Sequence, residues 1–200
     1  MHTMWDQRYA ASGYLYGTEP NQFFKQTLDT LKPGTILLPC EGEGRNAVYA
    51  ASRQWAVKAF DFSTEGHNKA LALAVSKKVS IDYQIAGAED YIYGENCFDA
   101  VGLFYTHFPY PLRTVLFTKT IMSLKPGGIL IAEVFDKSQL QNTSGGPKDI
   151  AWLFSTEELQ QDLKPLKILS LTKEQITLNE GPGHQGRADV IRVVAVNSIK

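Results

Sequence analysis

The sequence predicts an α/β fold: a doubly wound, mostly parallel sheet that ends in an antiparallel hairpin. Five short apolar segments alternate with helical patterns between residues 35 and 135, and two longer alternating segments follow near the C-terminus. Strands that read as apolar runs between helices are typical of a parallel sheet covered on both faces. In such a sheet, ligands bind outside the carboxyl ends of the strands, where the strand order reverses.

The expected elements follow from apolar periodicity and from the residues that start or stop helices and strands. A first helix in NQFFKQTLDTL stops at Pro33-Gly34. The core strands are expected at 35–39, 56–60, 80–85, 98–104 and 129–135. Helices are expected at 45–53, after a Ser63 cap, at 111–124 and after a Ser155/Glu158 capping box. A polar loop at 136–149 and a hairpin of residues 167–178 and 188–196 complete the chain.

Length and charge limit the classes of protein to consider. The 200 residues predict one domain, residues 1–200, and 20 basic against 21 acidic residues leave a net charge of −1. Such a chain has no overall positive field for nucleic acid or an anionic membrane. Two cysteines provide neither a disulfide framework nor a metal-ligand spacing, and no apolar run is long enough to span a membrane. We expect a cytoplasmic protein without a metal.

The segment CEGEGRN, residues 40–46, follows the first strand directly. Gly42 and Gly44 lack a Cβ, so they permit positive φ and a close approach of the backbone, and the next helix starts with free N–H groups. Asp61 ends the second strand, 17 residues beyond Gly44, where a carboxylate accepts hydrogen bonds from ribose hydroxyls. An ordinary turn has the same glycines, but the combination favours a nucleotide-like ligand.

Two alternatives remain open on these residues. Gly42-x-Gly44-x-x-Ala47 also satisfies the dinucleotide fingerprint, so an NAD-dependent oxidoreductase is the first alternative. Only the hairpin follows the fifth strand, whereas dehydrogenases usually need a further substrate domain. A cofactor-binding protein that has kept the fold and lost the chemistry is the second alternative.

Four segments in chain order resemble the motifs of class I S-adenosylmethionine-dependent methyltransferases: CEGEGRNAV, AFDFS, FDAVGLFYTHFP and LKPGGILIAEVF. GEGRN and the tail EGPGHQGRADVIRVVAV are similar to the tellurite-resistance and thiopurine-type branch. The resemblance implies a seven-stranded Rossmann-like core at 35–200, preceded by a lid and helix at 1–34. It also implies S-adenosylmethionine as the cofactor and a small-molecule acceptor.

The resemblance assigns cofactor contacts to particular positions. The glycine turn meets the methionine part, Asp61 holds the ribose, and the segment 87–90 flanks the adenine. The implied cofactor-binding residues are Glu41, Gly42, Glu43, Gly44, Arg45, Asn46, Asp61, Phe62, Ser63, Ala88, Glu89 and Phe104. The chain departs from the usual motif because Cys40 stands where a first glycine is common. Glu41, the acid next to Cys40, is then expected to meet the cofactor's ammonium group.

The acceptor side is expected at the end of the fourth strand, in the segment 104–109. Tyr105 and His107 are the candidate catalytic residues. Aromatic side chains there exclude water and face a sulfonium. His107 either orients or deprotonates a substrate, or only bonds a loop carbonyl. His184 and Arg187 are either surface turn residues or contacts for an anion.

A sulfonium already activates its methyl group, so alignment and exclusion of water are the main requirements on the protein. The sequence offers one obvious base, His107, and no paired carboxylate and histidine that spacing reveals. We therefore predict a small, soft or anionic acceptor, such as a thiolate, selenide or telluride, and a loss below tenfold for His107→Gln. Gly44→Val is expected to abolish binding in a folded protein.

Overall fold

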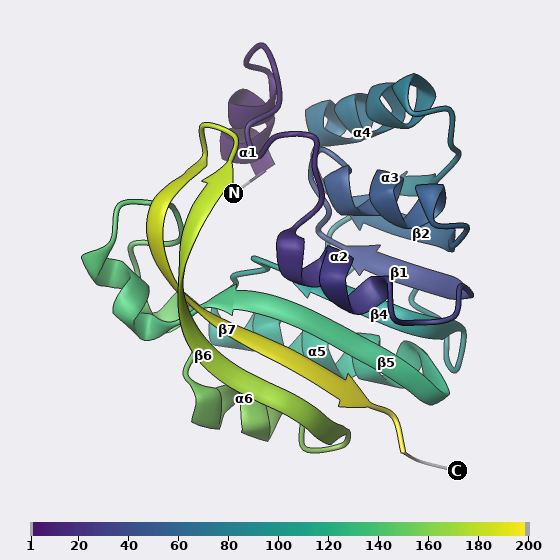
Figure 1. Ribbon diagram of the computed structural model, residues 1–200, viewed down its shortest axis with the longest axis vertical. Helices are drawn as coiled ribbons and strands as arrows, with labels where there is room; N and C mark the ends of the chain where they lie inside the picture. The colour runs from purple at the N-terminus through teal and green to yellow at the C-terminus, as the bar shows by residue number, and fades with distance from the viewer. Residues whose placement is uncertain (1, 199–200) are drawn as a thin grey trace.

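The computed structural model describes residues 2–198, so residues 1, 199 and 200 of the predicted domain lie outside it. Its core is a seven-stranded sheet in the order β3-β2-β1-β4-β5-β7-β6 (Figure 1). The strands are β1 (Thr35–Pro39), β2 (Ala56–Asp61), β3 (Asp82–Ile85), β4 (Phe98–Phe104), β5 (Leu124–Phe135), β6 (Lys167–Glu180) and β7 (His184–Val196). Strands β1 to β5 pair in parallel, and β7 pairs antiparallel with both β5 and β6. The predicted fold class is confirmed.

Helices cover both faces of the sheet. They are α1 (His2–Tyr9), α2 (Gln22–Leu28), α3 (Arg45–Ser52), α4 (Thr64–Ser76), α5 (Tyr110–Ser123) and α6 (Thr156–Asp162). Successive residues of β1 point to opposite faces, so Ile36 and Leu38 pack with α2, α3 and α4, whereas Leu37 packs in the core beneath α5 and α6. The predicted caps of α4 and α6 are both present, the second as a full capping box.

Several boundaries differ from the sequence prediction. β5 starts at Leu124 because that residue already pairs with Phe98 of β4. The hairpin strands are longer than expected because the turn between them has only three residues, 181–183. The predicted polar loop contains the 3₁₀ helix η1 (Lys137–Gln141), and a second 3₁₀ helix, η2 (Ile150–Trp152), follows the loop directly; α1 was not predicted. Within residues 2–198, no helix has the length and apolarity needed to cross a membrane.

The strand order reverses between β1 and β4, which places their carboxyl ends side by side. Cys40 and Tyr105 follow these two ends, and both have φ of 54°. Left-handed backbone at non-glycine residues is uncommon and clusters at functional sites. The tip of the β6–β7 hairpin reaches over this edge of the sheet to the N-terminal segment, where Gly183 N–H donates to the Leu15 carbonyl at 2.8 Å (Figure 1).

Candidate active site

A cavity of about 360 Å³ lies at the carboxyl ends of β1 and β4. Most of the predicted site residues line it: Glu41, Glu43, Arg45, Asn46, Asp61, Phe62, Phe104, Tyr105 and His107. The remaining ones do not: Gly42, Gly44, Ser63, Ala88 and Glu89. Ala88 is buried in the core, where its carbonyl accepts a hydrogen bond from Tyr93, and Glu89 is exposed. The predicted edge of strands therefore carries the cavity.

The two glycines of the turn serve packing between helices. Gly42 has φ of 59° and Gly44 has φ of 85°. A Cβ on Gly44 would lie 2.5 Å from the Cβ of Ala70 on α4, and one on Gly42 would lie 2.6 Å from the Tyr9 hydroxyl on α1. The expectation that Gly44→Val leaves the protein folded is therefore wrong, because the added side chain would meet Ala70 of α4 and would disturb the fold.

Asp61 joins the glycine turn after β1 to the turn after β2. Its Oδ2 accepts a hydrogen bond from Gly42 N–H at 3.1 Å, and its Oδ1 accepts one from Ser63 N–H at 2.9 Å. The carboxylate is buried and lines the cavity. Each carboxylate oxygen has two lone pairs, so one hydrogen bond to a backbone N–H does not use its whole accepting capacity.

Glu41 caps the start of α3. Its Oε1 accepts from the N–H groups of Asn46 at 2.7 Å and Ala47 at 2.8 Å, which compensates for the missing side chain of the N-cap residue Gly44. Burial raises the pKa of the Glu41 carboxyl from 4.5 to about 7, although these hydrogen bonds and Arg45 act in the opposite direction. An ammonium group in the cavity would favour its ionised form.

Glu43 ties the N-terminal segment to the core. Its Oε2 accepts from Leu15 N–H at 2.7 Å, and its Oε1 pairs with Lys69 of α4 at 2.9 Å. Lys69 also donates to the carbonyls of Ala11 and Gly13. The aromatic residues before this segment line the cavity, and Trp5 stacks on Tyr9 with 5.4 Å between ring centroids. Glu43 thus holds in place the segment that covers the cavity.

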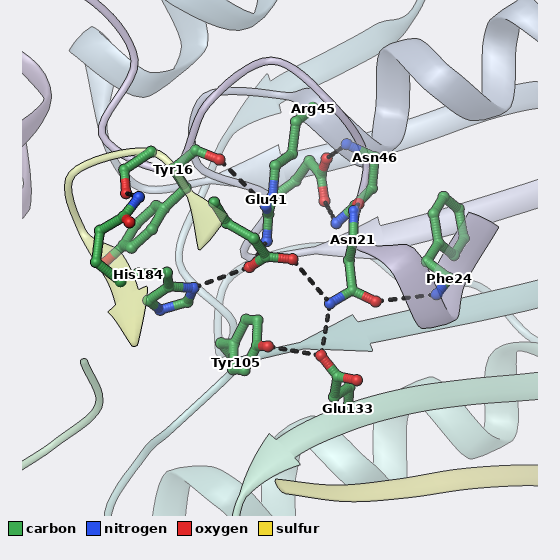
Figure 2. Close-up of polar contacts among 12 residues, drawn as sticks. Tyr16, Asn21, Phe24, Glu41, Arg45, Asn46, Tyr105, Glu133 and His184 are labelled. Carbon is green, nitrogen blue, oxygen red and sulfur yellow. Dashed lines mark hydrogen bonds and ion pairs between the residues drawn. The ribbon is translucent and has the colours of Figure 1, made fainter. Parts of the chain in front are cut away.

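Glu133 of β5 does not line the cavity, but it is the centre of a polar network that includes the cavity residue Tyr105 (Figure 2). It is fully buried, and its Oε1 accepts from the Tyr105 hydroxyl and from Asn21 Nδ2, each at 2.6 Å. Its Oε2 accepts from Arg192 Nε at 2.6 Å. We did not predict Glu133, although a lone carboxylate in the apolar strand ILIAEVF was a signal, because buried charges need partners.

Arg45 connects the helix after the glycine turn to two distant segments. Its Nη1 donates to the Tyr16 carbonyl at 3.1 Å (Figure 2). Its Nη2 pairs with Glu180 at 2.9 Å. Asn46 accepts from the backbone N–H of Asn21 at 2.9 Å. These two residues therefore bind chain segments around the cavity, a role that the turn motif did not indicate.

His107 lies at the cavity, as predicted, but both ring nitrogens have backbone partners. Nδ1 is 2.9 Å from the Trp152 carbonyl, so it carries the proton, and Nε2 accepts from Phe135 N–H at 3.3 Å. Burial lowers the pKa of His107 to about 4. The second of the two interpretations, a histidine that bonds a loop carbonyl, fits this geometry. Arg187 is exposed and does not line the cavity, whereas His184 is buried and does.

Within the part of the chain that the structure describes, no group of three His, Cys, Asp or Glu side chains could hold a metal ion.

Residues 36–128 match the family model described as a methyltransferase domain. The match runs from β1 into β5 and so includes the glycine turn, Asp61, Tyr105 and His107. The fold and this match define the class of protein: an enzyme that transfers methyl groups from S-adenosylmethionine, its cofactor. The comparison with curated proteins finds no match.

Three solved structures illustrate the shared fold. One comes from a study of the conversion of a disulfide bond into a thioacetal group during echinomycin biosynthesis, with 15% identity, a TM-score of 0.81 and coverage of 98% of this chain and 91% of that one. TehB from Haemophilus influenzae has 12% identity and a TM-score of 0.71, covering 96% of this chain and 65% of TehB.

The third is the N-methyltransferase NodS from Bradyrhizobium japonicum in complex with S-adenosyl-L-homocysteine. It has 12% identity and a TM-score of 0.71, with 99% of this chain and 98% of NodS covered. At such identities the likeness shows the shared fold alone.

Proposed function

We propose that the protein methylates a small molecule on a soft nucleophilic atom, with a thiol sulfur as the first candidate and selenium or tellurium as further ones. The observation that carries this proposal is the composition of the acceptor end of the cavity. Among the described lining residues that come from the ends of β4 and β5, from residues 145–152 and from the hairpin turn, none is Asp, Glu, Lys or Arg. A neutral acceptor such as a thiol needs no counter-ion there.

Aromatic rings form a continuous wall at this end. Tyr105 lies 4.7 Å from Phe135 and 4.5 Å from His184, and His107 lies 5.5 Å from Phe135, all between ring centroids. Polarisable sulfur makes favourable contacts with aromatic rings, and such a wall keeps water from the reacting atoms. The hydroxyl of Thr106 is buried with no hydrogen-bond partner in the described residues, and Thr106 lines the same cavity.

The cofactor side has donors and acceptors that suit S-adenosylmethionine. When bound, this cofactor supplies a methyl group on a positively charged sulfur. Asp61 would accept from its ribose hydroxyls, and the Glu41 carboxylate would pair with its ammonium group. Phe62 lines the cavity beside Asp61 and provides an apolar contact for the adenine. The predicted contacts of Ala88 and Glu89 have less support, because neither lines the cavity.

We also propose that residues 1–34 act as a lid and helix over the core at 35–200. Trp5, Arg8, Tyr9 and Tyr16 line the cavity, and the Glu43–Lys69 pair holds residues 11–15 against α4. The near-zero net charge supports a small-molecule partner rather than nucleic acid or a membrane surface. Two free cysteines favour a cytoplasmic setting.

The test is a panel of acceptors with S-adenosylmethionine as donor. The purified protein is incubated with a thiol, a selenol, tellurite, a phenol and a primary amine of similar size, and the release of S-adenosylhomocysteine is measured. We expect the soft acceptors to be turned over fastest. Faster turnover of the amine or the phenol would contradict the proposal. Calorimetry with S-adenosylhomocysteine and with NAD provides the control, since only the first should bind.

A further inference from the structure

Glu180 ends β6 and His184 starts β7, so the three-residue turn between them places the two side chains together. His184 Nδ1 lies 3.1 Å from Glu180 Oε2. An ionised carboxylate can only accept a hydrogen bond, so Nδ1 carries the ring proton and Nε2 keeps a free lone pair. Among the described residues, no hydrogen bond is made to Nε2. This is the paired carboxylate and histidine that spacing alone did not reveal.

The His184 ring lies in the aromatic wall at the acceptor end of the cavity. Its centroid is 4.4 Å from that of Tyr16 and 4.5 Å from that of Tyr105. Desolvation is the largest influence on this buried ring and lowers its pKa, so the imidazole is neutral at pH 7. Arg45 acts in the same direction, while Glu180 and Glu133 oppose it. His107, the other imidazole in the cavity, is itself neutral.

We propose that His184, oriented by Glu180, is the general base that takes the proton from a thiol acceptor. The inference rests on the proposed function, because a thiol must lose its proton to become the nucleophile. In the balanced step, the S–H proton moves to Nε2 and the thiol sulfur bonds to the methyl carbon. The bond from that carbon to the sulfonium breaks, and its electron pair stays on the cofactor sulfur, which becomes neutral.

The two histidines of the cavity differ in their hydrogen bonds. Both nitrogens of His107 bond backbone groups, so it would have to break a hydrogen bond to accept a proton. His184 has one nitrogen held by a carboxylate and the other without a partner in the described structure, which is the arrangement of an oriented base. The Glu180 carboxylate also stabilises the imidazolium that forms.

The kinetic test compares two thiols on the same variant. The thiol group of 2-mercaptoethanol is protonated at pH 7, whereas 4-nitrothiophenol is already ionised. We expect His184→Gln to lower the rate of S-adenosylhomocysteine release about 100-fold with 2-mercaptoethanol and less than about fivefold with 4-nitrothiophenol. Raising the pH to 9 should restore part of the first rate. Glu180→Gln should also slow the reaction of 2-mercaptoethanol more than that of 4-nitrothiophenol, with a smaller loss of rate than in His184→Gln.

Partial unfolding of a variant would lower both rates by the same factor. A change in the ratio of the two rates therefore reports on the proton transfer alone. His67→Gln, on α4 and outside the cavity, is the matched control and should leave both rates unchanged. Equal losses with both thiols in His184→Gln would overturn the inference and leave the proposed function intact. If the wild type methylates neither thiol, the proposed function and this inference are both contradicted.

A second measurement needs no donor or acceptor. The chain has 4 histidines, so nitrogen NMR of the free protein can resolve each ring, with the His184 signals assigned by their loss in His184→Gln. We expect a neutral ring at pH 7 with the proton on Nδ1. A proton on Nε2, or a charged ring at pH 7, would overturn the inference.

Discussion

The two ends of the cavity differ in what the nearby carboxylates bond. In the cofactor half, Asp61 and Glu41 line the cavity and accept hydrogen bonds mainly from backbone N–H groups of nearby turns, although Glu43 is held by Leu15 and Lys69. In the acceptor half, Glu133 and Glu180 bond the cavity residues Tyr105 and His184 but do not line the cavity themselves. Side chains from segments far away in the sequence hold these two carboxylates, including Asn21, Arg45 and Arg192. The first half therefore depends more on local turns, and the second depends on side chains that only the folded chain brings together.

This difference has consequences for stability and for function. A carboxylate that bonds local backbone stabilises its own turn and leaves lone pairs for a ligand. A carboxylate in a buried network of side chains depends on every partner, so the loss of one leaves an uncompensated charge. We therefore expect substitutions in the acceptor half to affect folding most, and substitutions in the cofactor half to affect binding.

The largest effect should come from Glu133→Gln. This change leaves the Arg192 guanidinium with one carboxylate, the partly exposed Glu174, and should lower the free energy of unfolding by about 4 kcal/mol. Urea denaturation measures it. The matched control is Glu174→Gln, which removes the other partner of the same arginine and should cost less than about 1 kcal/mol. Equal losses would mean that the buried network is not what holds the acceptor half.

A second prediction uses pH to compare one group from each half. The pKa of the Glu41 carboxyl is raised from 4.5 to about 7 in the folded state. Protonation of Glu41 therefore stabilises the folded state, and this stabilisation is lost as pH rises from 4.5 to 7. The lowered pKa of His107, about 4 against 6.5, has the opposite sign, and its contribution is lost as pH falls from 6.5 to 4. Each contribution is about 3 kcal/mol at most.

Because the two contributions oppose each other, the wild type should vary little in this window. Denaturation from pH 4 to 7.5 should show that Glu41→Gln loses stability more steeply on acidification than the wild type, and that His107→Gln loses less. Parallel curves for the two variants would show that neither group titrates as its surroundings indicate.

The third prediction separates backbone strain from packing in the cofactor half. Gly44→Ala should destabilise the protein about 2 kcal/mol more than Gly13→Ala. Both residues have positive φ, 85° and 79°, but a Cβ on Gly13 meets no atom within 4 Å, whereas one on Gly44 meets Ala70. Urea midpoints give the comparison. Similar losses would mean that the turn strain alone requires glycine.

The fourth prediction concerns binding. Asp61→Ala should weaken S-adenosylmethionine binding by roughly 1.5 to 3 kcal/mol, the range for hydrogen bonds to a charged acceptor. Isothermal calorimetry measures it. Asp82→Ala, at a surface ion pair on neighbouring β3, is the control and should bind normally. Unchanged affinity in Asp61→Ala would remove this residue from the cofactor site.

The smallest effect should be that of His107→Gln on turnover, a loss of less than about tenfold. Its ring bonds two backbone groups and has no nitrogen left to accept a proton. The rate of S-adenosylhomocysteine release between pH 6 and 9 is the measurement. A loss above a hundredfold with a flattened pH profile would make His107 the base and would contradict the role given to His184.

The sequence by itself determined the fold and the cofactor half, because both depend on short-range patterns. Apolar runs of strand length and helix caps such as Ser63 and the Ser155/Glu158 box predicted the elements, and the glycine turn followed by Asp61 predicted the edge of the sheet that carries the cavity. These signals are local, since a turn and the strand before it lie within a few residues of each other.

Only the tertiary structure decided the acceptor half and the true role of Gly44. Glu133 lies 112 residues from Asn21 and 59 from Arg192, and no local pattern links such positions. Glu180 and His184 are close in sequence, but they face each other only because the strands pair up to a three-residue turn. The pairing of buried charges follows from which side chains the folded sheet brings together, so it is a property of long-range packing.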